Sequence, residues 1–357
     1  MVNYKTILPF VAGIILIFVF IHFVGYNEFV TLIKRSNPLY LGLAFVFQLL
    51  NLFFEAYKWK PLLESLKTKV SMKNVFISTM VGIFFNNVTP SAKTGGEPMK
   101  TFLISKDEEI GPIENVFATV TTDRLVESLP FFVLAIFSVM YVNLFYNVRW
   151  ATIALLSFVI IIYVFVLLVA TYICFNKKAG EKIVFKVLRI VGKFSKRINK
   201  YEDLALSMVE NFHEQFQLIL KSRNVLYKSL AASIAMWACW ILRTYFVFLA
   251  LGKPLNPLLV ALVSTISLLI GLLPLLPGGL GSIEVTMTVL YASLKVGKNI
   301  ALTATILDRI ISFWFVLVFA GIITSYNLSK LKSMKSEAKS RMISHNEENE
   351  PNKQINI

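Results

Sequence analysis

A few ionisable residues interrupt otherwise apolar stretches of this chain. The pairs Asp123-Arg124 and Asp308-Arg309 each open a long apolar run, and Arg243 lies well inside a third, WACWILRTYFVF. Charged groups within apolar segments are costly, so each is a candidate functional residue. Guanidinium groups bind phosphate oxygens in a bidentate manner, which favours a lipid phosphate as the ligand of the three arginines. The alternative is a structural salt-bridge network, and both roles are compatible.

Two glutamates lie beside Gly-rich turns. Glu97 precedes Pro98, and proline is favoured at the first positions of a helix. Ser282 is expected to cap the helix that carries Glu284 in its first turn. Helix N-termini expose free N–H groups and bind anions. Each glutamate is therefore expected either to cap its own helix or to meet a cationic headgroup or a buried arginine.

The spacing around Asp123 adds a further carboxylate. Asp123 and Glu127 share one helix face, so we expect a cation between them. Asp123 and Arg124 cannot pair merely through adjacency, because neighbouring helical residues do not face each other. Glu55 lies close to the end of its apolar run, and we expect its side chain to extend to the aqueous surface.

The same series of residues occurs twice. One unit reads GIFFNNVTPSAKTGGEPMK and then ATVTTDRLVES, and the other reads GLLPLLPGGLGSIEVT and then ATILDRIISFW. The separation of Pro90 from Pro277 equals that of Glu97 from Glu284, and the separation of the two Asp-Arg pairs is nearly the same. Such a series at a near-constant offset predicts an internal repeat, with units at about 75–146 and 258–325.

Each unit begins with an apolar region that a turn interrupts. The turn residues are Pro90, Gly95 and Gly96 in the first unit and Pro277, Gly278, Gly279 and Gly281 in the second. Irregular backbone at membrane depth occurs only where it is buried in protein or lines a cavity. We therefore predict re-entrant helical hairpins at 75–105 and 258–294, which place a binding site near the middle of the membrane.

The composition requires a membrane environment for these elements. Of 357 residues, 56% are hydrophobic and 16% are charged. Six runs are long enough to cross the bilayer as helices: 7–24, 38–57, 125–146, 150–175, 225–251 and 300–325. The net charge is +15, and most of the basic residues lie between these runs. This indicates cytoplasmic loops that contact anionic lipid headgroups, and it argues against nucleic acid as the partner.

The distribution of positive charge predicts the orientation. With the N-terminus in the cytoplasm, 25 of the 36 lysines and arginines, Lys58 among them, fall in inside segments, and 6 fall in outside loops. This predicts a multi-pass protein of the cell membrane with both termini cytoplasmic. Three full spans separate the hairpins, so the second repeat is expected to be inverted relative to the first.

The remaining segments carry no sign of a catalytic or metal centre. The basic loop 176–224 has the pattern of an amphipathic helix on the inner leaflet, and the tail 326–357 is polar, so the membrane domain is predicted to cover 1–325. The two cysteines and three histidines lack metal-ligand spacing. We expect neither a metal nor a cofactor.

The motifs NNVTPSAKTGGEPMK, TTDRLVES, LLPLLPGGLGSIE and ATILDRIISFW resemble the lysylphosphatidylglycerol synthase transmembrane region, also called the flippase-like domain family (UPF0104). The resemblance implies a membrane domain that translocates aminoacyl-phosphatidylglycerol to the outer leaflet. It also implies that the lipid path is lined by Glu97, Asp123, Arg124, Glu284, Asp308 and Arg309. Two-domain members carry a soluble aminoacyl-transferase after the membrane part. Only the short tail follows the last span here, so we expect no synthase activity.

The sequence therefore predicts a lipid flippase that is not itself an enzyme. Its partners would be membrane lipids with an anionic phosphate. Because relatives occur beside glycosyltransferases, a polyprenyl-phosphate sugar is an alternative substrate. A second alternative is an accessory subunit of a lipid-modifying transferase docked on the loop 176–224. No nucleotide-binding motif is present, so transport is expected to be passive or coupled to an ion.

Overall fold

The computed structural model describes residues 26–66, 68–89, 95–106, 110–145, 150–192, 202–271 and 277–327, and within them every regular element is helical. The helices are α2 (Tyr26–Arg35), α3 (Pro38–Tyr57), α4 (Lys60–Glu64), α5 (Met72–Val88), α6 (Glu97–Ile104), α7 (Ile113–Phe145), α8 (Trp150–Phe175), α9 (Lys177–Gly192), α10 (Glu202–Lys221), α11 (Arg223–Ala250), α12 (Pro257–Gly271), α13 (Ser282–Ser293) and α14 (Lys298–Arg309). Short helices η2 (Pro277–Gly279) and η3 (Ile310–Trp314) complete the described elements.

Four of the described helical segments are long and apolar enough to cross a membrane: Pro38–Glu64, Ile113–Phe145, Arg223–Ala250 and Lys298–Asn327. They coincide with four of the predicted runs. A fifth span is obtained if Ile160–Phe175 and Lys177–Ile183, which meet at 105°, are counted together, and it matches the predicted run 150–175. The predicted run 7–24 and most of the tail lie outside the described residues. The chain is thus an all-helical membrane protein.

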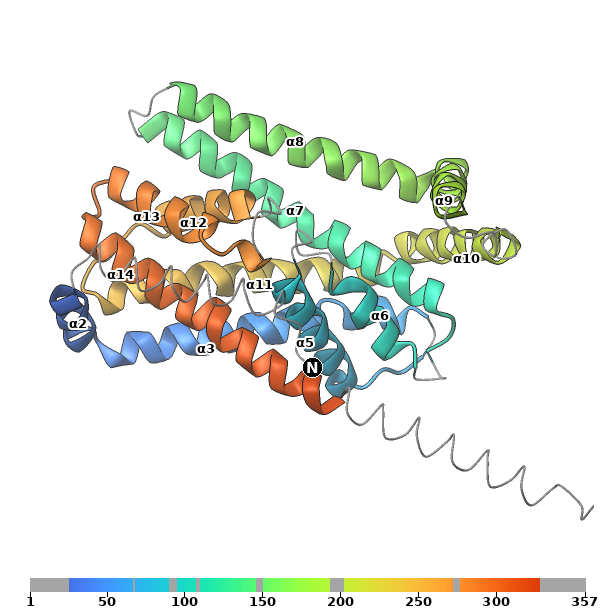
Figure 1. Cartoon of the computed structure of the whole chain (residues 1–357), viewed down its shortest axis with the longest axis horizontal. Coiled ribbons are helices and arrows are strands. Elements are labelled where there is room, and N and C mark those ends of the chain that lie inside the picture. The colour runs from blue at the N-terminus through green and yellow to red at the C-terminus, as the bar shows by residue number, and fades with distance from the viewer. Residues whose placement is uncertain are drawn as a thin grey trace, which may run out of the picture.

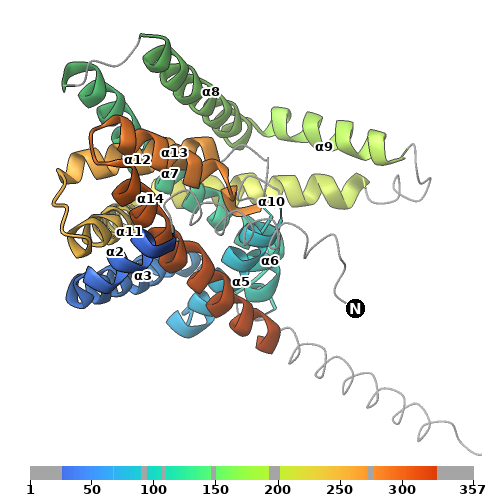
Figure 2. The same cartoon turned by 60° about the vertical axis from the view of Figure 1, so that its left-hand side comes forward.

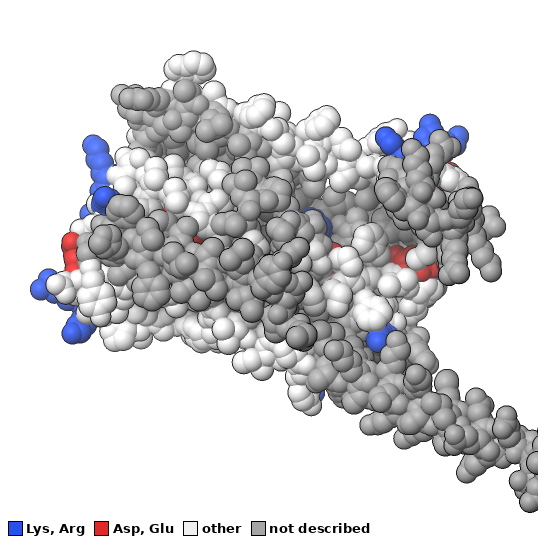
Figure 3. Space-filling view, in the orientation of Figure 1, with Lys and Arg blue, Asp and Glu red and all other residues white. Residues whose placement is uncertain are grey.

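The spans run broadly along the long axis of the molecule (Figure 1). On the face in Figure 3, the charged side chains of the described residues gather mainly at the two ends of this axis, and few are visible between them. Large apolar side chains are exposed on the long helices, including Phe137 of α7, Phe165 of α8 and Ile322. In water these groups would be unfavourable, but lipid chains solvate them.

Helices α3 and α11 form the centre of the bundle. They pack along each other, and the Asn51 amide of α3 donates a hydrogen bond to the Met236 carbonyl oxygen of α11 at 3.0 Å. Buried side chains of α11, α12, α13 and α14 form one apolar core, and those of α3 to α7 and α10 form another. The polar site described below lies between these two cores.

The predicted basic loop 176–224 folds into α9 and α10, which lie side by side at one end of the molecule (Figures 1 and 2). His213 of α10 is buried, and its ring nitrogens contact the carbonyl oxygens of Val209 at 2.9 Å and Ile173 at 3.2 Å. These contacts tie α10 to the end of α8. His213 thus has a structural role in this arrangement.

Both predicted hairpins consist of two packed helices, α5 with α6 and α12 with α13. The first crossing is very tight at Gly96. A Cβ atom built there would lie 1.9 Å from the backbone oxygen of Gly82. Only glycine permits this approach, so the Gly-rich sequence of the first turn reflects a close contact between α5 and the start of α6.

We therefore expect Gly96→Ala to force α6 away from α5 and to lower the free energy of unfolding by about 1–3 kcal/mol, the usual cost of overpacking. Gly42→Ala is the control, because a Cβ atom there meets nothing within 4 Å. Thermal unfolding in detergent would measure both variants. Equal melting temperatures for the two would contradict the packing described here.

Candidate functional site

Lys58 lies at the centre of the first group of buried charges. It follows α3 directly and is fully buried. Its Nζ donates to both carboxylate oxygens of Asp123 at 2.8 Å and to Oε2 of Glu127 at 2.9 Å. The expectation that a cation separates Asp123 from Glu127 is confirmed. The assignment of Lys58 to a cytoplasmic loop is wrong, because three short contacts hold it inside the protein.

Arg124 turns away from Asp123 towards other carboxylates. Its Nε donates to Oε1 of Glu97 at 2.9 Å, and its Nη1 donates to Oε2 of Glu127 at 2.7 Å. Asp123 instead accepts from Lys100 of α6 at 3.1 Å. As expected, the neighbours Asp123 and Arg124 bind different partners. Together these contacts join α6 to α7.

Two further side chains complete this group. The Asn86 side-chain oxygen accepts a hydrogen bond from the Gly96 N–H at 2.7 Å, which links the end of α5 to the start of α6. Glu55 of α3 has Oε1 at 3.6 Å from Lys58 Nζ and at 3.8 Å from Arg124 Nη1. The expectation that Glu55 extends to the surface is wrong, because both cations draw it inward.

Arg243 and Asp308 form the second group of buried charges. Arg243 Nε lies 2.9 Å from Asp308 Oδ1, and its Nη2 lies 3.2 Å from Oδ2, which makes the pair bidentate. Gln48 of α3 accepts from Arg243 Nη1 at 2.8 Å, and the Thr244 hydroxyl donates to Asp308 at 2.7 Å. The aspartate and arginine are almost fully buried, and their polar atoms are well satisfied.

Arg309 binds the second hairpin. Its Nε donates to Glu284 Oε1 at 2.6 Å, and its Nη2 donates to the Gly278 carbonyl oxygen at 3.1 Å. Glu284 Oε2 accepts from the Gly281 N–H at 2.7 Å. Both expected roles of Glu284, helix cap and arginine partner, therefore occur together.

One detail of this turn differs from the prediction. Gly281, not Ser282, is the N-cap of α13, and its φ of 80° favours glycine. The Ser282 hydroxyl donates instead to the Gly279 carbonyl oxygen at 3.0 Å. The Glu284 carboxylate accepts the bond from the N-cap N–H, so the Ser282 hydroxyl is not needed as a cap and can bind Gly279. Pro90, the predicted turn proline of the first hairpin, lies outside the described residues.

The two charge groups have the same plan. In each, the arginine after the aspartate binds the glutamate of its own hairpin, Arg124 with Glu97 and Arg309 with Glu284. In each, the aspartate binds a cation 65 residues before it, Lys58 or Arg243. A π-helical turn, Ile310–Trp314, follows Arg309 directly, and such turns are frequent at functional sites.

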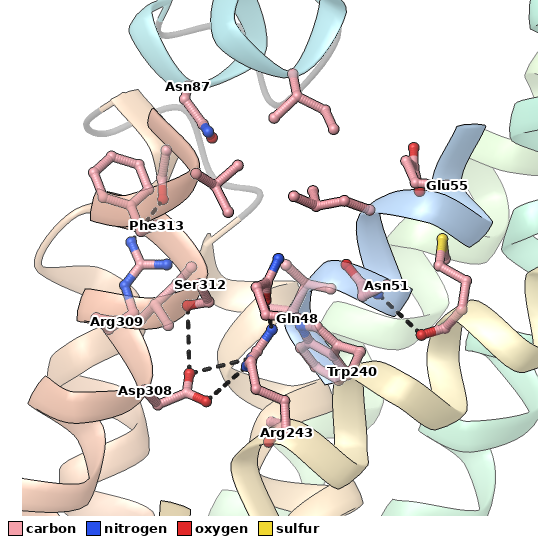
Figure 4. Close-up of a pocket in the computed structure, with 18 of the residues that line it drawn as sticks. Gln48, Asn51, Glu55, Asn87, Trp240, Arg243, Asp308, Arg309, Ser312 and Phe313 are labelled. Atoms are coloured by element: carbon pink, nitrogen blue, oxygen red, sulfur yellow. Dashed lines mark hydrogen bonds and ion pairs between the residues drawn. The ribbon is translucent and has the colours of Figure 1, made fainter. Parts of the chain in front are cut away.

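A cavity of about 200 Å³ lies between the two groups. Six of the predicted site residues line it: Arg124, Glu127, Arg243, Gly278, Asp308 and Arg309. Glu97 and Glu284 are buried beside them and bind Arg124 and Arg309. Asp123 is buried there too and binds Lys58. In Figure 4 Arg243 and Asp308 face each other below Gln48, and Glu55 and Asn87 lie on the opposite wall. The charged residues predicted for the site thus lie on or beside one cavity.

In this conformation the three arginines bind carboxylates. Each of Arg124, Arg243 and Arg309 has such a partner, so the structure contains the salt-bridge network that the sequence left as an alternative. An anion that binds these guanidinium groups in a bidentate manner therefore competes with their carboxylates. Among the described residues, no cluster of His, Cys, Asp and Glu side chains has the geometry of a metal site.

Several residues of this site were not predicted from the sequence. Lys58, Lys100 and Gln48 carry hydrogen bonds to the predicted residues, and Glu55 and Trp240 line the cavity. The repeat contained a signal for Lys58. Its separation from Arg243 equals the separation of Asp123 from Asp308.

Comparison with known proteins places most of the chain in one group. Residues 6–320 match the family model described as the lysylphosphatidylglycerol synthase TM region. A UPF0104 membrane protein of Methanothermobacter thermautotrophicus is 31% identical over 88% of this chain and 93% of its own length. A UPF0104 membrane protein of Pyrococcus horikoshii is 30% identical over 92% of this chain and 99% of its own length.

A shorter match involves an enzyme. The glycosyltransferase AglD of Haloferax volcanii is 30% identical over 165 residues, which cover 44% of this chain and 26% of that protein. No solved structure matches the chain significantly.

Proposed function

Because this chain belongs to the lysylphosphatidylglycerol synthase transmembrane-region family, we propose that it is a translocase for a lipid with an anionic phosphate. The observation that carries the proposal is the cavity that joins the two buried charge groups. Intramembrane arginines and carboxylates around a cavity mark substrate paths in transporters. The headgroup would pass through this cavity while the acyl chains remain in the bilayer.

The residues that line the cavity support an inverted repeat. Several wall residues form pairs at the offset that relates the two Asp-Arg motifs: Asn51 with Met236, Glu55 with Trp240, and Arg124 with Arg309. Asn51 and Met236 also contact each other directly, which places them close to an axis between the units. In this proposal the two hairpins are re-entrant from opposite sides, six helices span the cell membrane, and both termini are cytoplasmic. Inverted repeats of this kind support alternating access.

The ion pairs suggest how the site exchanges between empty and loaded states. A phosphate oxygen offers an arginine the same bidentate acceptors as a carboxylate. A lipid phosphate can therefore replace Glu97 on Arg124, or Glu284 on Arg309, without leaving a bare cation in the membrane. The released carboxylate can receive a cationic headgroup, and Asn86 and Asn87 offer hydrogen bonds nearby. While the lipid phosphate occupies the arginine of one repeat, the arginine–glutamate ion pair of the other repeat stays intact.

Aminoacyl-phosphatidylglycerol fits this scheme, because it carries a phosphate and a cationic group. The match to AglD supports a second candidate, a polyprenyl-phosphate sugar. Its phosphate would use the same arginines, and its sugar hydroxyls would bind the amides of Gln48 and Asn51. The protein acts in either case as a transporter, not as an enzyme, and α9 with α10 would serve as the docking site for a transferase that makes the lipid.

Replacing both hairpin glutamates tests the proposal. In liposomes with fluorescent aminoacyl- and glycolipids, the wild type is expected to expose the probe to a membrane-impermeant quencher faster than protein-free vesicles. Glu97→Gln/Glu284→Gln should abolish this gain, because neither hairpin then has a carboxylate that can exchange with the lipid phosphate on its arginine. Glu64→Gln/Glu210→Gln is the matched control, since these glutamates are exposed. Transport of every probe at the protein-free rate by the wild type would refute the proposal.

A further inference from the structure

The two repeats share a core that is electrically neutral. Each core consists of an aspartate with its cation and a glutamate with its arginine. The members are Asp123, Lys58, Glu97 and Arg124 in the charge group of the first repeat and Asp308, Arg243, Glu284 and Arg309 in that of the second, with Lys58 and Arg243 contributed from just before each unit. Two positive and two negative charges balance in each. Such balance is expected for charges buried in a membrane, where an unpaired charge is costly.

The first repeat contains three further charged side chains around this core, Glu55, Lys100 and Glu127. At the corresponding positions the second repeat has Trp240, Met287 and Ser312, none of them charged. The first repeat thus has two carboxylates and one ammonium group that the second repeat lacks. With every group ionised, the first charge group has one negative charge too many.

Glu55 is the carboxylate to which this excess belongs. Glu97, Asp123 and Glu127 each accept a hydrogen bond of 3.1 Å or shorter from Lys58, Lys100 or Arg124. Among the contacts of the described residues, Glu55 has no hydrogen bond, and its nearest cations lie at 3.6 and 3.8 Å. Both cations are already engaged by shorter bonds.

The position of Glu55 gives protons access to it. It lies inside the span Pro38–Glu64 and lines the cavity, with 14% of its side chain exposed there. The charged groups around it are Lys58 on its own segment and Asp123, Arg124 and Glu127 on α7. Its counterpart Trp240 lines the same cavity from α11 and brings no charge.

We propose that Glu55 binds one proton per transport cycle and thereby couples lipid movement to the proton gradient. The inference rests on the proposed function. When a lipid phosphate engages Arg124, the carboxylates lose part of that cation, and Glu55 takes a proton from water in the cavity to form a neutral carboxyl group. The proton leaves when Arg124 returns to Glu97 and Glu127. One O–H bond forms and later breaks, and no other bond changes.

This coupling is reciprocal by thermodynamic linkage. If phosphate binding favours proton uptake by Glu55, a proton on Glu55 must favour phosphate binding by the same factor. The lipid phosphate and the proton are therefore expected to occupy the site together, and the bound proton offsets one negative charge of the phosphate. The second repeat contains no equivalent of Glu55 at position 240, so the first repeat alone supplies the coupling proton.

Infrared spectroscopy tests the proton site without any transport. The purified protein in nanodiscs is expected to show the C=O band of a buried protonated carboxyl group that disappears as pH is raised. Glu55→Gln should lose this band, and Glu64→Gln, which removes an exposed glutamate of the same segment, should retain it. A band that persists unchanged in Glu55→Gln, or that is absent from the wild type at every pH, overturns the proposal.

Transport under a pH gradient tests the coupling. In liposomes with a fluorescent phospholipid probe, wild-type rates should change when a gradient is imposed and change in the opposite sense when it is reversed. In Glu55→Gln the ratio of rates with and without the gradient should fall to about one. A wild-type rate that ignores the gradient, or a variant that follows it fully, overturns the coupling. If the wild type moves no probe, the proposed function fails, while the infrared result still decides the proton site.

Discussion

Lys58→Met is expected to lower the free energy of unfolding by about 3–5 kcal/mol, enough to prevent recovery of a folded protein at physiological temperature. The methionine fills a similar volume but brings no charge. Asp123 and Glu127 would then lose the group that donates to both of them at 2.8 and 2.9 Å. Two buried carboxylates would face each other across an apolar side chain. Unfolding in mixed detergent micelles would measure the loss.

Lys60→Met provides the control for charge and length. Lys60 lies two residues further along and pairs with Glu64 near the surface, where a salt bridge contributes about 0–1 kcal/mol. A double variant, Lys58→Met/Asp123→Asn, tests the cause. If unpaired charge is what destabilises the single variant, removing one carboxylate should recover part of the loss. Equal stability of Lys58→Met and Lys60→Met would contradict the burial of Lys58.

Lys58 also illustrates what the sequence could and could not predict. It follows an apolar run and precedes a second lysine, the pattern of a cytoplasmic loop under the positive-inside rule. Nothing local distinguishes it from Lys60. Its burial arises from partners on α7, far along the chain, which draw it inward. The available signal was its separation from Arg243, which matches that of the two Asp-Arg motifs and makes Lys58 the counterpart of an intramembrane cation.

Other parts of the fold followed from local patterns. The runs of apolar residues predicted the four spans that the described residues contain, and a fifth if the bent pair is counted, because helix length in a membrane is set by the bilayer. The Gly-rich turns predicted where the paired helices break, because a contact as close as that between Gly96 and Gly82 excludes other residues. The helix that carries Asp123 begins earlier than the predicted run, at Ile113. Its first turns are too polar for a hydropathy pattern and are stabilised by contacts with other helices.

The sequence predicted which residues belong to the site, but not which of them form ion pairs with each other. The repeat identified Glu97, Glu284 and the two Asp-Arg pairs as matched residues. It did not show that each arginine binds the glutamate of its own hairpin, because that depends on how α6 packs on α7 and how α13 packs on α14. Glu55 was misplaced for a similar reason. Lys58 lies one helical turn away on the same span, but Arg124 belongs to α7, and only the folded chain brings it to Glu55.

The pair Arg243–Asp308 should show one of the strongest couplings between two side chains in this protein. Its bidentate contacts of 2.9 and 3.2 Å are almost fully buried, and Gln48 and Thr244 satisfy the remaining polar atoms. Removing either partner leaves a buried charge, which costs about 3–5 kcal/mol. Removing both replaces the pair with apolar contacts, so the double variant should be more stable than the sum of the single changes predicts.

A double-mutant cycle with Arg243→Met, Asp308→Leu and the combined variant measures this coupling. The same cycle on the exposed pair Lys177–Glu210 is the internal reference, and we expect it to give about 0–1 kcal/mol. Because α3, α11 and α14 meet at Arg243, the double variant is also expected to fold while losing transport. An Arg243–Asp308 coupling as small as that of the exposed pair would mean that water screens these charges, and would contradict the buried, bidentate ion pair described here.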